Sequence, residues 1–346
     1  MRTHVRTVLV LALVVGLLAL FLHNVDLWRV ATEILRARPQ WLALALLTML
    51  LNLAIRAWRW QFLLEPLGRP TFGSAFRATA VGFAATSMLP ARAGEVIRPY
   101  FLARTERHHE KMTATGAFAT IILERVLDTI TVLILLASFV FVFGREHSAS
   151  SPVAFTAVKW AGSLAGLAAA SALVVLFFLA GDPGRLGRIM LRLEKVVPSV
   201  LAGLLAKVAE KFAHGLGAIR RPSRLLLSLL LSLPLWLSIC LGTWSVTMAF
   251  GFDVPFTGSF LLVAVLVLGV AVPTPGAVGG FHEAFRVATT VFFAVPDDAA
   301  VAAAIVLHLL TIGPVLLLGL LFAAQAGLNV NGMRRLADQP QPGQTA

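Results

Sequence analysis

Residues 300–323 read AVAAAIVLHLLTIGPVLLLGLLFA, a run of 24 positions without any Asp, Glu, Lys or Arg. A helix needs about 20 apolar residues to cross the hydrocarbon core of a bilayer, so this run is long enough to span a membrane. The whole chain has the same character, since 58% of its 346 residues are hydrophobic and 13% are charged. Soluble domains average about 45–50% apolar and about 25% charged residues. We therefore predict an all-α polytopic membrane protein.

Six stretches have the length and composition of membrane spans. They are residues 5–22, 41–64, 116–143, 154–180, 225–250 and 300–323. Two further stretches, 72–111 and 257–295, each contain an apolar segment that is interrupted by proline or glycine and followed by a second short segment. We predict one transmembrane domain over residues 1–330, with an amphipathic connector at 181–224 and a polar tail at 331–346.

Loop charges predict how the chain is threaded, because cytoplasmic loops carry an excess of Lys and Arg. The basic segments are 1–7, 91–111 and 181–224; the neutral or acidic ones are 144–152, 251–256 and 296–299. These two sets stay on opposite sides only if each broken stretch leaves the membrane on the side where it entered. We predict two re-entrant hairpins from opposite sides, with both termini cytoplasmic. Eight ordinary spans are the alternative, and residues 23–40 fit the charge rule poorly on the outside.

Composition excludes several classes of function. The net charge of +12 does not predict nucleic-acid binding, because there is too little polar surface to form a basic face. Cys240 is the single cysteine, so no internal disulfide forms. The neighbours His108 and His109 would point apart on a helix, so we expect no metal site and no cofactor.

The two predicted hairpins resemble each other. The first begins Phe72-Gly-Ser-Ala-Phe76 and the second Phe256-Thr-Gly-Ser-Phe260; each then has an apolar run, a proline break and a glutamate, Glu95 or Glu283. Paired broken segments in two halves of opposite orientation are typical of transporters built from an inverted repeat, with the site at the breaks. We therefore predict such a repeat.

Glu124, Arg125 and Asp128 lie inside the predicted span 116–143. An ionisable group at the centre of a membrane helix costs about 2.5–3.5 kcal/mol on the lenient insertion scale, so such groups are functional candidates. Glu124 and Asp128 are four residues apart and share a helix face, while Arg125 can pair with Asp128. A self-neutralising ion cluster that fixes this helix to its neighbours is the structural alternative.

The first hairpin tip carries Arg92, Glu95 and Arg98, spaced three apart after Pro90. A helix that begins at membrane depth offers backbone N–H groups and a partial positive charge. Together with the arginines, this predicts a site for a phosphate-sized anion. Ordinary cytoplasmic loop charges are the alternative interpretation.

The second tip is rich in glycine. Gly276, Gly279 and Gly280 allow close packing and unusual backbone angles, and His282 and Glu283 follow directly. We expect Glu283 either to exchange a proton or simply to balance a nearby arginine.

Two arginines in the second span receive a different interpretation. Arg56 and Arg59 alternate with Trp58 and Trp60, a pattern typical of residues that anchor a helix at the membrane interface. We therefore predict an interfacial rather than a functional role for them.

These motifs resemble those of a known family. Arg-Ala-Gly-Glu after Leu-Pro, then Glu-Arg-x-x-Asp, then a Pro-Gly-x-x-Gly-Gly tip followed by glutamate are similar to the lysylphosphatidylglycerol synthase transmembrane family, also called flippase-like. The resemblance covers nearly the whole chain. The residues on family motif positions are Arg92, Gly94, Glu95, Glu124, Arg125, Asp128, Pro275, Gly276, Gly279 and Glu283. One departure is His282, which stands where many members have the glutamate.

The resemblance implies movement of aminoacylated or other anionic phospholipids between leaflets, in the plasma (inner) membrane of a bacterium. We expect a translocase rather than an enzyme, because only about 20 residues follow the last span and leave no room for the aminoacyl-transfer domain of the full-length synthases. Its expected partners are membrane lipids with anionic headgroups. Two alternatives stay open: a non-catalytic partner of a lipid-synthesis enzyme, and a membrane-embedded transferase that uses a polyprenyl phosphate, although such enzymes usually need a larger outer loop.

Overall fold

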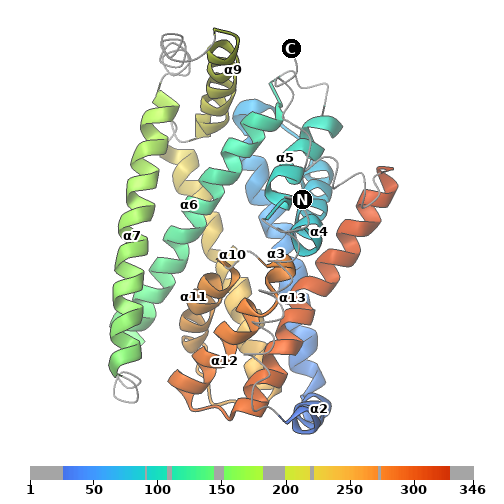
Figure 1. The fold of residues 1–346 in the computed structure, drawn as a ribbon, viewed down its shortest axis with the longest axis vertical. Coiled ribbons are helices and arrows are strands. Elements are labelled where there is room, and N and C mark those ends of the chain that lie inside the picture. Colours follow the sequence, from blue (N-terminus) through green and yellow to red (C-terminus); the bar gives the residue numbers. More distant parts are fainter. Residues whose placement is uncertain are drawn as a thin grey trace, which may run out of the picture.

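The computed structural model describes residues 26–89, 92–106, 111–143, 152–181, 199–218, 222–271 and 274–327. The described residues form helices and no strand, which confirms the all-α fold (Figure 1). The helices are α2 (Leu27–Arg36), α3 (Pro39–Leu64), α4 (Phe72–Met88), α5 (Gly94–Thr105), α6 (Ala114–Ser138), α7 (Pro152–Gly181), α9 (Ser199–Gly215), α10 (Pro222–Ala249), α11 (Gly258–Ala271), α12 (Gly280–Phe293) and α13 (Asp297–Gln325). The predicted first span, the tail and residues 182–198 of the connector lie outside the described residues.

Four described helices are long and apolar enough to cross a membrane. They cover Pro39–Leu67, Pro152–Phe178, Ser223–Ala249 and Asp297–Gln325. Helix α6 is of similar length, 25 residues, but it carries three charged residues in its interior. The chain is thus a polytopic membrane protein, and α6 carries charged side chains within the length of a span.

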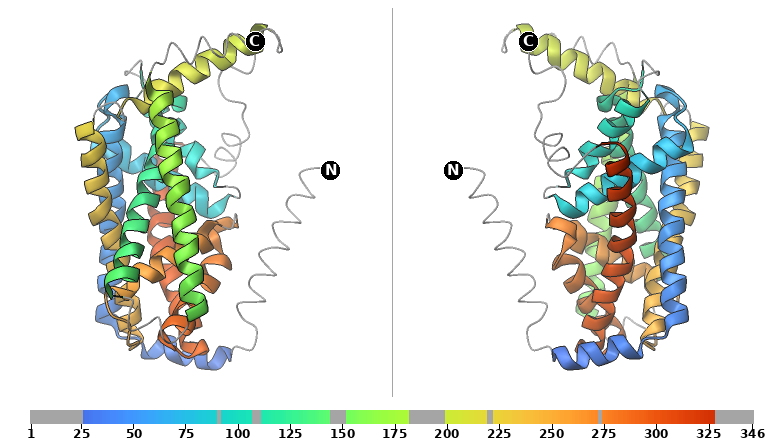
Figure 2. Two further views of the ribbon diagram at one scale, coloured as in Figure 1. Left: turned by 90° about the vertical axis from the view of Figure 1, so that its left-hand side faces the viewer. Right: turned by 90° about the vertical axis from the view of Figure 1, so that its right-hand side faces the viewer.

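Two pairs of short helices fold back as hairpins, α4 with α5 and α11 with α12. These helices have 12 to 17 residues, or about 18–26 Å at 1.5 Å per residue, which is shorter than a hydrocarbon core of about 30 Å. The hairpins occupy opposite halves of the bundle, and their tips approach each other near its middle (Figures 1 and 2). At the junction Arg92 Nη2 donates a hydrogen bond to the carbonyl oxygen of Val270, at 3.3 Å.

The two halves of the chain repeat one order of elements in opposite directions. Helices α3, α4, α5 and α6 follow as long, short, short and long, and α10, α11, α12 and α13 do the same. In Figure 1, α3 runs upward from the end where α2 lies, whereas α10 runs downward. The two long first helices pack together, and each hairpin packs against the last long helix of the other half, α4 with α13 and α11 with α6. This is the arrangement that the predicted inverted repeat requires.

The ends of the bundle are covered by short helices. Helix α2 lies across one end and α9 across the other (Figure 2). Residues 23–40, predicted as an outer loop, therefore contain a helix, which begins where the Asp26 carboxylate accepts the backbone N–H groups of Trp28 and Arg29. The amphipathic pattern of the connector is present as helix in α9, which packs against α6.

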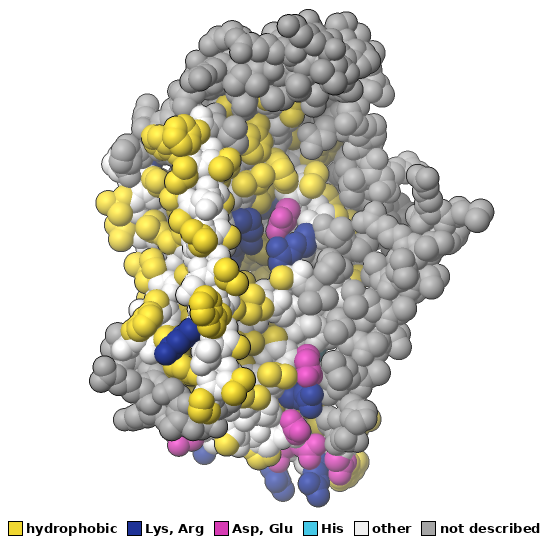
Figure 3. Space-filling view, turned by 60° about the vertical axis from the view of Figure 1, so that its left-hand side comes forward, with side chains coloured by type: hydrophobic (Ala, Val, Ile, Leu, Met, Phe, Trp, Pro, Cys, Tyr) yellow, Lys and Arg dark blue, Asp and Glu magenta, His cyan; other side chains and the backbone are white. Residues whose placement is uncertain are grey.

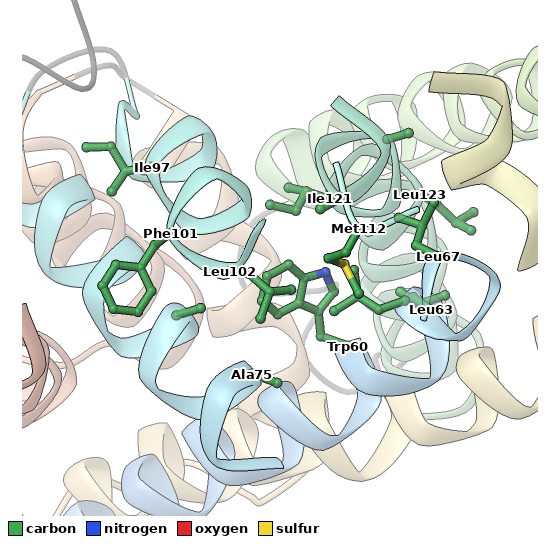
Figure 4. Packing of buried hydrophobic residues seen from close by; sticks show 14 of the residues in the cluster. Trp60, Leu63, Leu67, Ala75, Ile97, Phe101, Leu102, Met112, Ile121 and Leu123 are labelled. Atoms are coloured by element: carbon green, nitrogen blue, oxygen red, sulfur yellow. The ribbon is translucent and has the colours of Figure 1, made fainter. Parts of the chain in front are cut away.

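The core beside the first hairpin is built around Trp60. Its indole is fully buried between α3, α4, α5 and α6 (Figure 4), and its Nε1 donates to Thr120 Oγ1 at 2.9 Å. Glycines let the hairpin helices approach, because a Cβ atom on Gly94 would overlap the carbonyl oxygen of Gly82 in α4. Gly269 of α11 is pressed against Gly280 of α12 in the same way. In both hairpins the two helices therefore pack with their backbones in close contact.

Candidate functional site

Glu124 is the centre of a buried cluster of charges. Its side chain is completely buried in α6, and four arginines from three helices surround it. Oε1 lies 3.5 Å from Arg56 Nη1, 3.5 Å from Arg59 Nη2, 3.1 Å from Arg98 Nη1 and 2.8 Å from Arg125 Nη2. One carboxylate thus connects α3, α5 and α6.

Asp128 lies one turn further along α6 and shares three of these arginines. Oδ1 is 2.6 Å from Arg59 Nη1, and Oδ2 is 3.4 Å from Arg56 Nη1 and 3.6 Å from Arg125 Nη2. Trp236 of α10 donates its Nε1–H to Oδ1 at 3.0 Å. The shared face of Glu124 and Asp128 and the pairing of Arg125 with Asp128 are as the sequence predicted.

The interfacial role predicted for Arg56 and Arg59 is wrong. Their exposed fractions are 6% and 0%, and both face the two carboxylates. Trp58 alone of the neighbouring aromatic residues points outward, with 48% exposure. The cost of a charge inside a span, which identified Glu124, applied equally to these arginines and was the signal that could have found them.

The first tip divides its three charged residues between two environments. Arg92 and Glu95 form a partly exposed pair, with 3.6 Å between Arg92 Nη1 and Glu95 Oε1. Arg98 is instead buried, with its guanidinium 3.8 Å from the centre of the Trp60 ring and paired with Glu124. The N–H groups of Glu95 and Val96 donate to the carbonyl oxygens of Arg92 and Ala93. These two N–H groups are therefore not free for an anion, and the side chains of Arg92 and Arg98 are donors at the same tip.

The second tip is held by unusual backbone angles and two histidines. Gly276 has φ +61° and Gly279 φ +86°, values that favour glycine. The N–H of Gly279 donates to His282 Nδ1 at 3.2 Å, and His308 Nε2 of α13 lies 2.8 Å from the carbonyl oxygen of Gly276. The two imidazole rings are 4.4 Å apart. His308, absent from the sequence predictions, thus ties the second tip to α13.

Glu283 lies apart from the arginine cluster. Its two carboxylate oxygens bind Arg286 Nη2 at 2.8 Å and Nε at 2.9 Å, and the side chain lines neither cavity described below. Of the two sequence-based interpretations, the geometry favours the structural pair. Pro275 and Gly280 likewise shape the tip, with Pro275 opening its 3-10 turn and Gly280 beginning α12.

Two adjoining cavities lie where the hairpins meet. The larger has a volume of about 450 Å³ and is walled by α3, α6, α10, α11 and α13; the smaller, about 210 Å³, lies beside α4 and α5. Arg56 and Asp128 line the larger one, Arg98 and Glu95 the smaller one. The residues that line both are Phe83, Ser87, Arg92, Arg125, Val270, Phe281, Thr311 and Ile312. Arg92 and Arg125 thus line both parts of a largely apolar space.

Some of the charged side chains of the site are exposed on the flank of the bundle. Figure 3 shows basic and acidic side chains in a hollow at mid-height, framed by hydrophobic side chains. The exposed side-chain fractions are 41% for Arg92, 32% for Glu95 and 37% for Arg125. Among the described residues, these three side chains are thus partly exposed on a flank that is mainly apolar.

The comparison with known families agrees with the motifs and the fold. The family model of the lysylphosphatidylglycerol synthase TM region matches residues 7–319. The chain belongs to this family. A UPF0104 membrane protein of Methanocaldococcus jannaschii is 27% identical over 126 residues, which cover 36% of each chain. This chain thus matches about a third of the length of that relative.

Most of the family motif residues lie at or near the cavities. Glu95, Arg125 and Asp128 line them, and Glu124 pairs with Arg125 beside them. Gly94 and Gly276 also line the smaller cavity, and Gly94 in addition supports the contact of α5 with α4. Among the described residues, no group of three His, Cys, Asp or Glu side chains is placed to hold a metal ion. The neighbours His108 and His109 lie outside the described part of the chain.

Proposed function

We propose that this protein is a lipid translocase, which binds the headgroup of an anionic phospholipid, an aminoacylated lipid or a related lipid and moves it across the membrane. The observation that carries the proposal is the cavity of about 450 Å³, in which Arg56, Arg92 and Arg125 meet aliphatic walls. Arginine binds phosphate bidentately, and the aliphatic walls suit an acyl chain. Binding and moving a lipid requires no chemical reaction, so we propose that the chain is not an enzyme.

The position of the site suggests how transport would work. The arginines lie where two hairpins from opposite halves meet, with a cavity on either side of Arg92 and Arg125. A headgroup held there is midway between the two ends of the bundle. Rocking of one half against the other would open it alternately to each leaflet, as in transporters with inverted repeats.

We further propose the orientation and location of the protein. The end that carries α9 and the α5–α6 connection faces the cytoplasm of a bacterium, because these elements belong to the basic segments 181–224 and 91–111. Residues of α2 and the α12–α13 turn would then face outward. The inner membrane is the compartment that fits this arrangement.

Reconstitution tests the proposal. The purified chain is inserted into liposomes with a panel of labelled anionic, aminoacylated and zwitterionic lipids, and movement of each label between leaflets is measured. We expect the wild type to accelerate movement of at least one anionic lipid. Arg92→Lys should lower the rate at least about tenfold, because lysine keeps the charge but loses the planar fork. Arg69→Lys, at an exposed end of the bundle, is the matched control and should transport normally.

The other outcomes point to other functions. If folded wild-type protein moves no lipid, translocation is refuted and a role as partner of a lipid-synthesis enzyme takes its place. If the liposomes instead accumulate a lipid product from a polyprenyl phosphate donor, the protein is a transferase.

A further inference from the structure

The buried charges around Glu124 do not balance. Four guanidinium groups, of Arg56, Arg59, Arg98 and Arg125, face the two carboxylates of Glu124 and Asp128. The cluster therefore carries a formal charge of +2 among the described residues. Adding the neighbouring pair Arg92 and Glu95 leaves the sum unchanged, since that pair is neutral.

Hydrogen bonding around the same cluster is also incomplete. Five buried guanidinium nitrogens find no hydrogen-bond acceptor in the described part of the chain. They are Nε and Nη2 of Arg59, Nε and Nη2 of Arg98, and Nε of Arg125. Buried N–H groups nearly always have acceptors, so these unsatisfied donors point to an oxygen-rich anion.

Two of the three arginines with unsatisfied donors line a cavity, whereas Arg59 is completely buried and lines neither. Arg98 and Arg125 both line the cavity of about 210 Å³, and Arg125 also lines the larger one. Arg98 is only 4% exposed, so its guanidinium group is largely shielded from water. An anion that enters the smaller cavity meets these two side chains and Arg92 together.

Building on the proposed translocase, we infer that the preferred headgroup is a terminal phosphate monoester with two negative charges, rather than a phosphodiester with one. A dianion brings the +2 cluster to neutrality, whereas a diester leaves one positive charge uncompensated in the membrane, which is costly. A monoester also presents three terminal oxygens to the free N–H donors. The shared chemistry is a dianionic phosphate, and the lipid supplies it.

Two lipids with identical acyl chains test the inference. The affinities of dioleoyl phosphatidic acid and dioleoyl phosphatidylmethanol for the full chain in detergent are measured by tryptophan fluorescence. The methyl ester adds one small group and removes one ionisable oxygen, so size is nearly constant. At pH 7.5 we expect phosphatidic acid to bind at least about tenfold more tightly. At pH 5 the preference should largely disappear, because a monoester loses its second charge near pH ~6.

The results separate the inference from the proposed function. Equal affinity of the two lipids at pH 7.5, or a preference that does not change with pH, overturns the dianion assignment while lipid binding stands. Binding of neither lipid refutes both. Inorganic phosphate is the third probe: if it binds as tightly as phosphatidic acid, the ligand is a soluble phosphate and the lipid source is wrong.

A variant tests the charge count directly. Arg125→Gln lowers the cluster from +2 to +1, so the ratio of the two lipid affinities should fall several-fold even if both lipids bind more weakly. Arg69→Gln removes one charge from an exposed position with 84% side-chain exposure and should leave the ratio unchanged. An unchanged ratio in folded Arg125→Gln protein contradicts the inference; if that variant does not fold, the pH dependence of the wild type decides.

Discussion

Glu124 shows how one residue can serve both folding and binding. Its carboxylate contacts all four arginines of the cluster, whereas Asp128 contacts three of them. Without the charge of Glu124, Asp128 would be the only carboxylate of the cluster. The structure thus favours the ion cluster among the two sequence-based interpretations, while the same cluster leaves positive charge available for a ligand.

The first prediction concerns Glu124→Gln, which keeps the shape of the side chain and removes its charge. Breaking a buried ion pair by neutralising one partner costs about 3–5 kcal/mol, so we expect a large loss of folded protein in thermal unfolding assays in detergent. Glu95→Gln is the control, because Glu95 is 32% exposed and pairs with Arg92 alone among the described residues, and such pairs contribute about 1 kcal/mol or less. A Glu124→Gln protein that is stable but inactive would instead establish a switching role.

At this scale the sequence predicted part of the site. The charges of α6 were found because a charge inside an apolar run is conspicuous. Arg56 and Arg59 were misassigned because alternating arginine and tryptophan also occur at membrane interfaces, and a sequence does not show how deep in the membrane each turn lies. Arg59 is completely buried, with Asp128 of α6 and Ser232 of α10 accepting from its guanidinium, and α10 is distant from Arg59 in the chain.

At the scale of elements, glycines decide how closely the hairpin helices pack. The sequence predicted special backbone angles at the second tip, and Gly276 and Gly279 confirm this with positive φ. Gly94 has a different role, since the space that a side chain would need is filled by the backbone of α4 at Gly82. Such a contact depends on the three-dimensional path of two helices, so the motif alone did not reveal it.

The second prediction follows from this contact. Gly94→Ala should destabilise the protein by about 1–3 kcal/mol, because the added methyl group forces α5 away from α4. Gly313→Ala in α13 is a matched control, since a Cβ there meets no atom within 4 Å; alanine favours helix by up to about 1 kcal/mol. Thermal unfolding of both variants measures the difference. Equal stability of the two would show that α4 and α5 can separate freely.

At the scale of the whole molecule, the two ends of the bundle differ in their connections. The turn 65–71 and α9 lie at one end, and the turn at 250–257 lies at the other with α2 (Figure 1). The charge rule predicted opposite sides for the connector and for 251–256, and it required only counting residues. The short helix α2 was not predicted, because its 10 residues include three charged ones and do not form a long apolar run.

The third prediction tests this orientation by labelling. In a Cys240→Ala background, Asp253→Cys should react with a membrane-impermeant maleimide on intact cells, because the residue is exposed on the proposed outer side. Arg69→Cys, 84% exposed at the other end, should react only after the membrane is opened. The reverse pattern would invert the proposed topology.

The last prediction concerns movement of the two halves. The hairpin tips touch where the carbonyl of Ser87 in α4 faces Gly276, and Ser87 and Ala277 both line the smaller cavity. A headgroup can pass from one side of this contact to the other only if the tips separate. We therefore expect a short, reducible cross-linker between Ser87→Cys and Ala277→Cys, in the Cys240→Ala background, to stop lipid movement in liposomes, and a reductant to restore it. Each single cysteine variant treated with the same reagent is the control. Because binding needs only the arginines, the cross-linked protein should still bind lipid; undiminished transport after complete cross-linking would show that the lipid crosses without parting the hairpins.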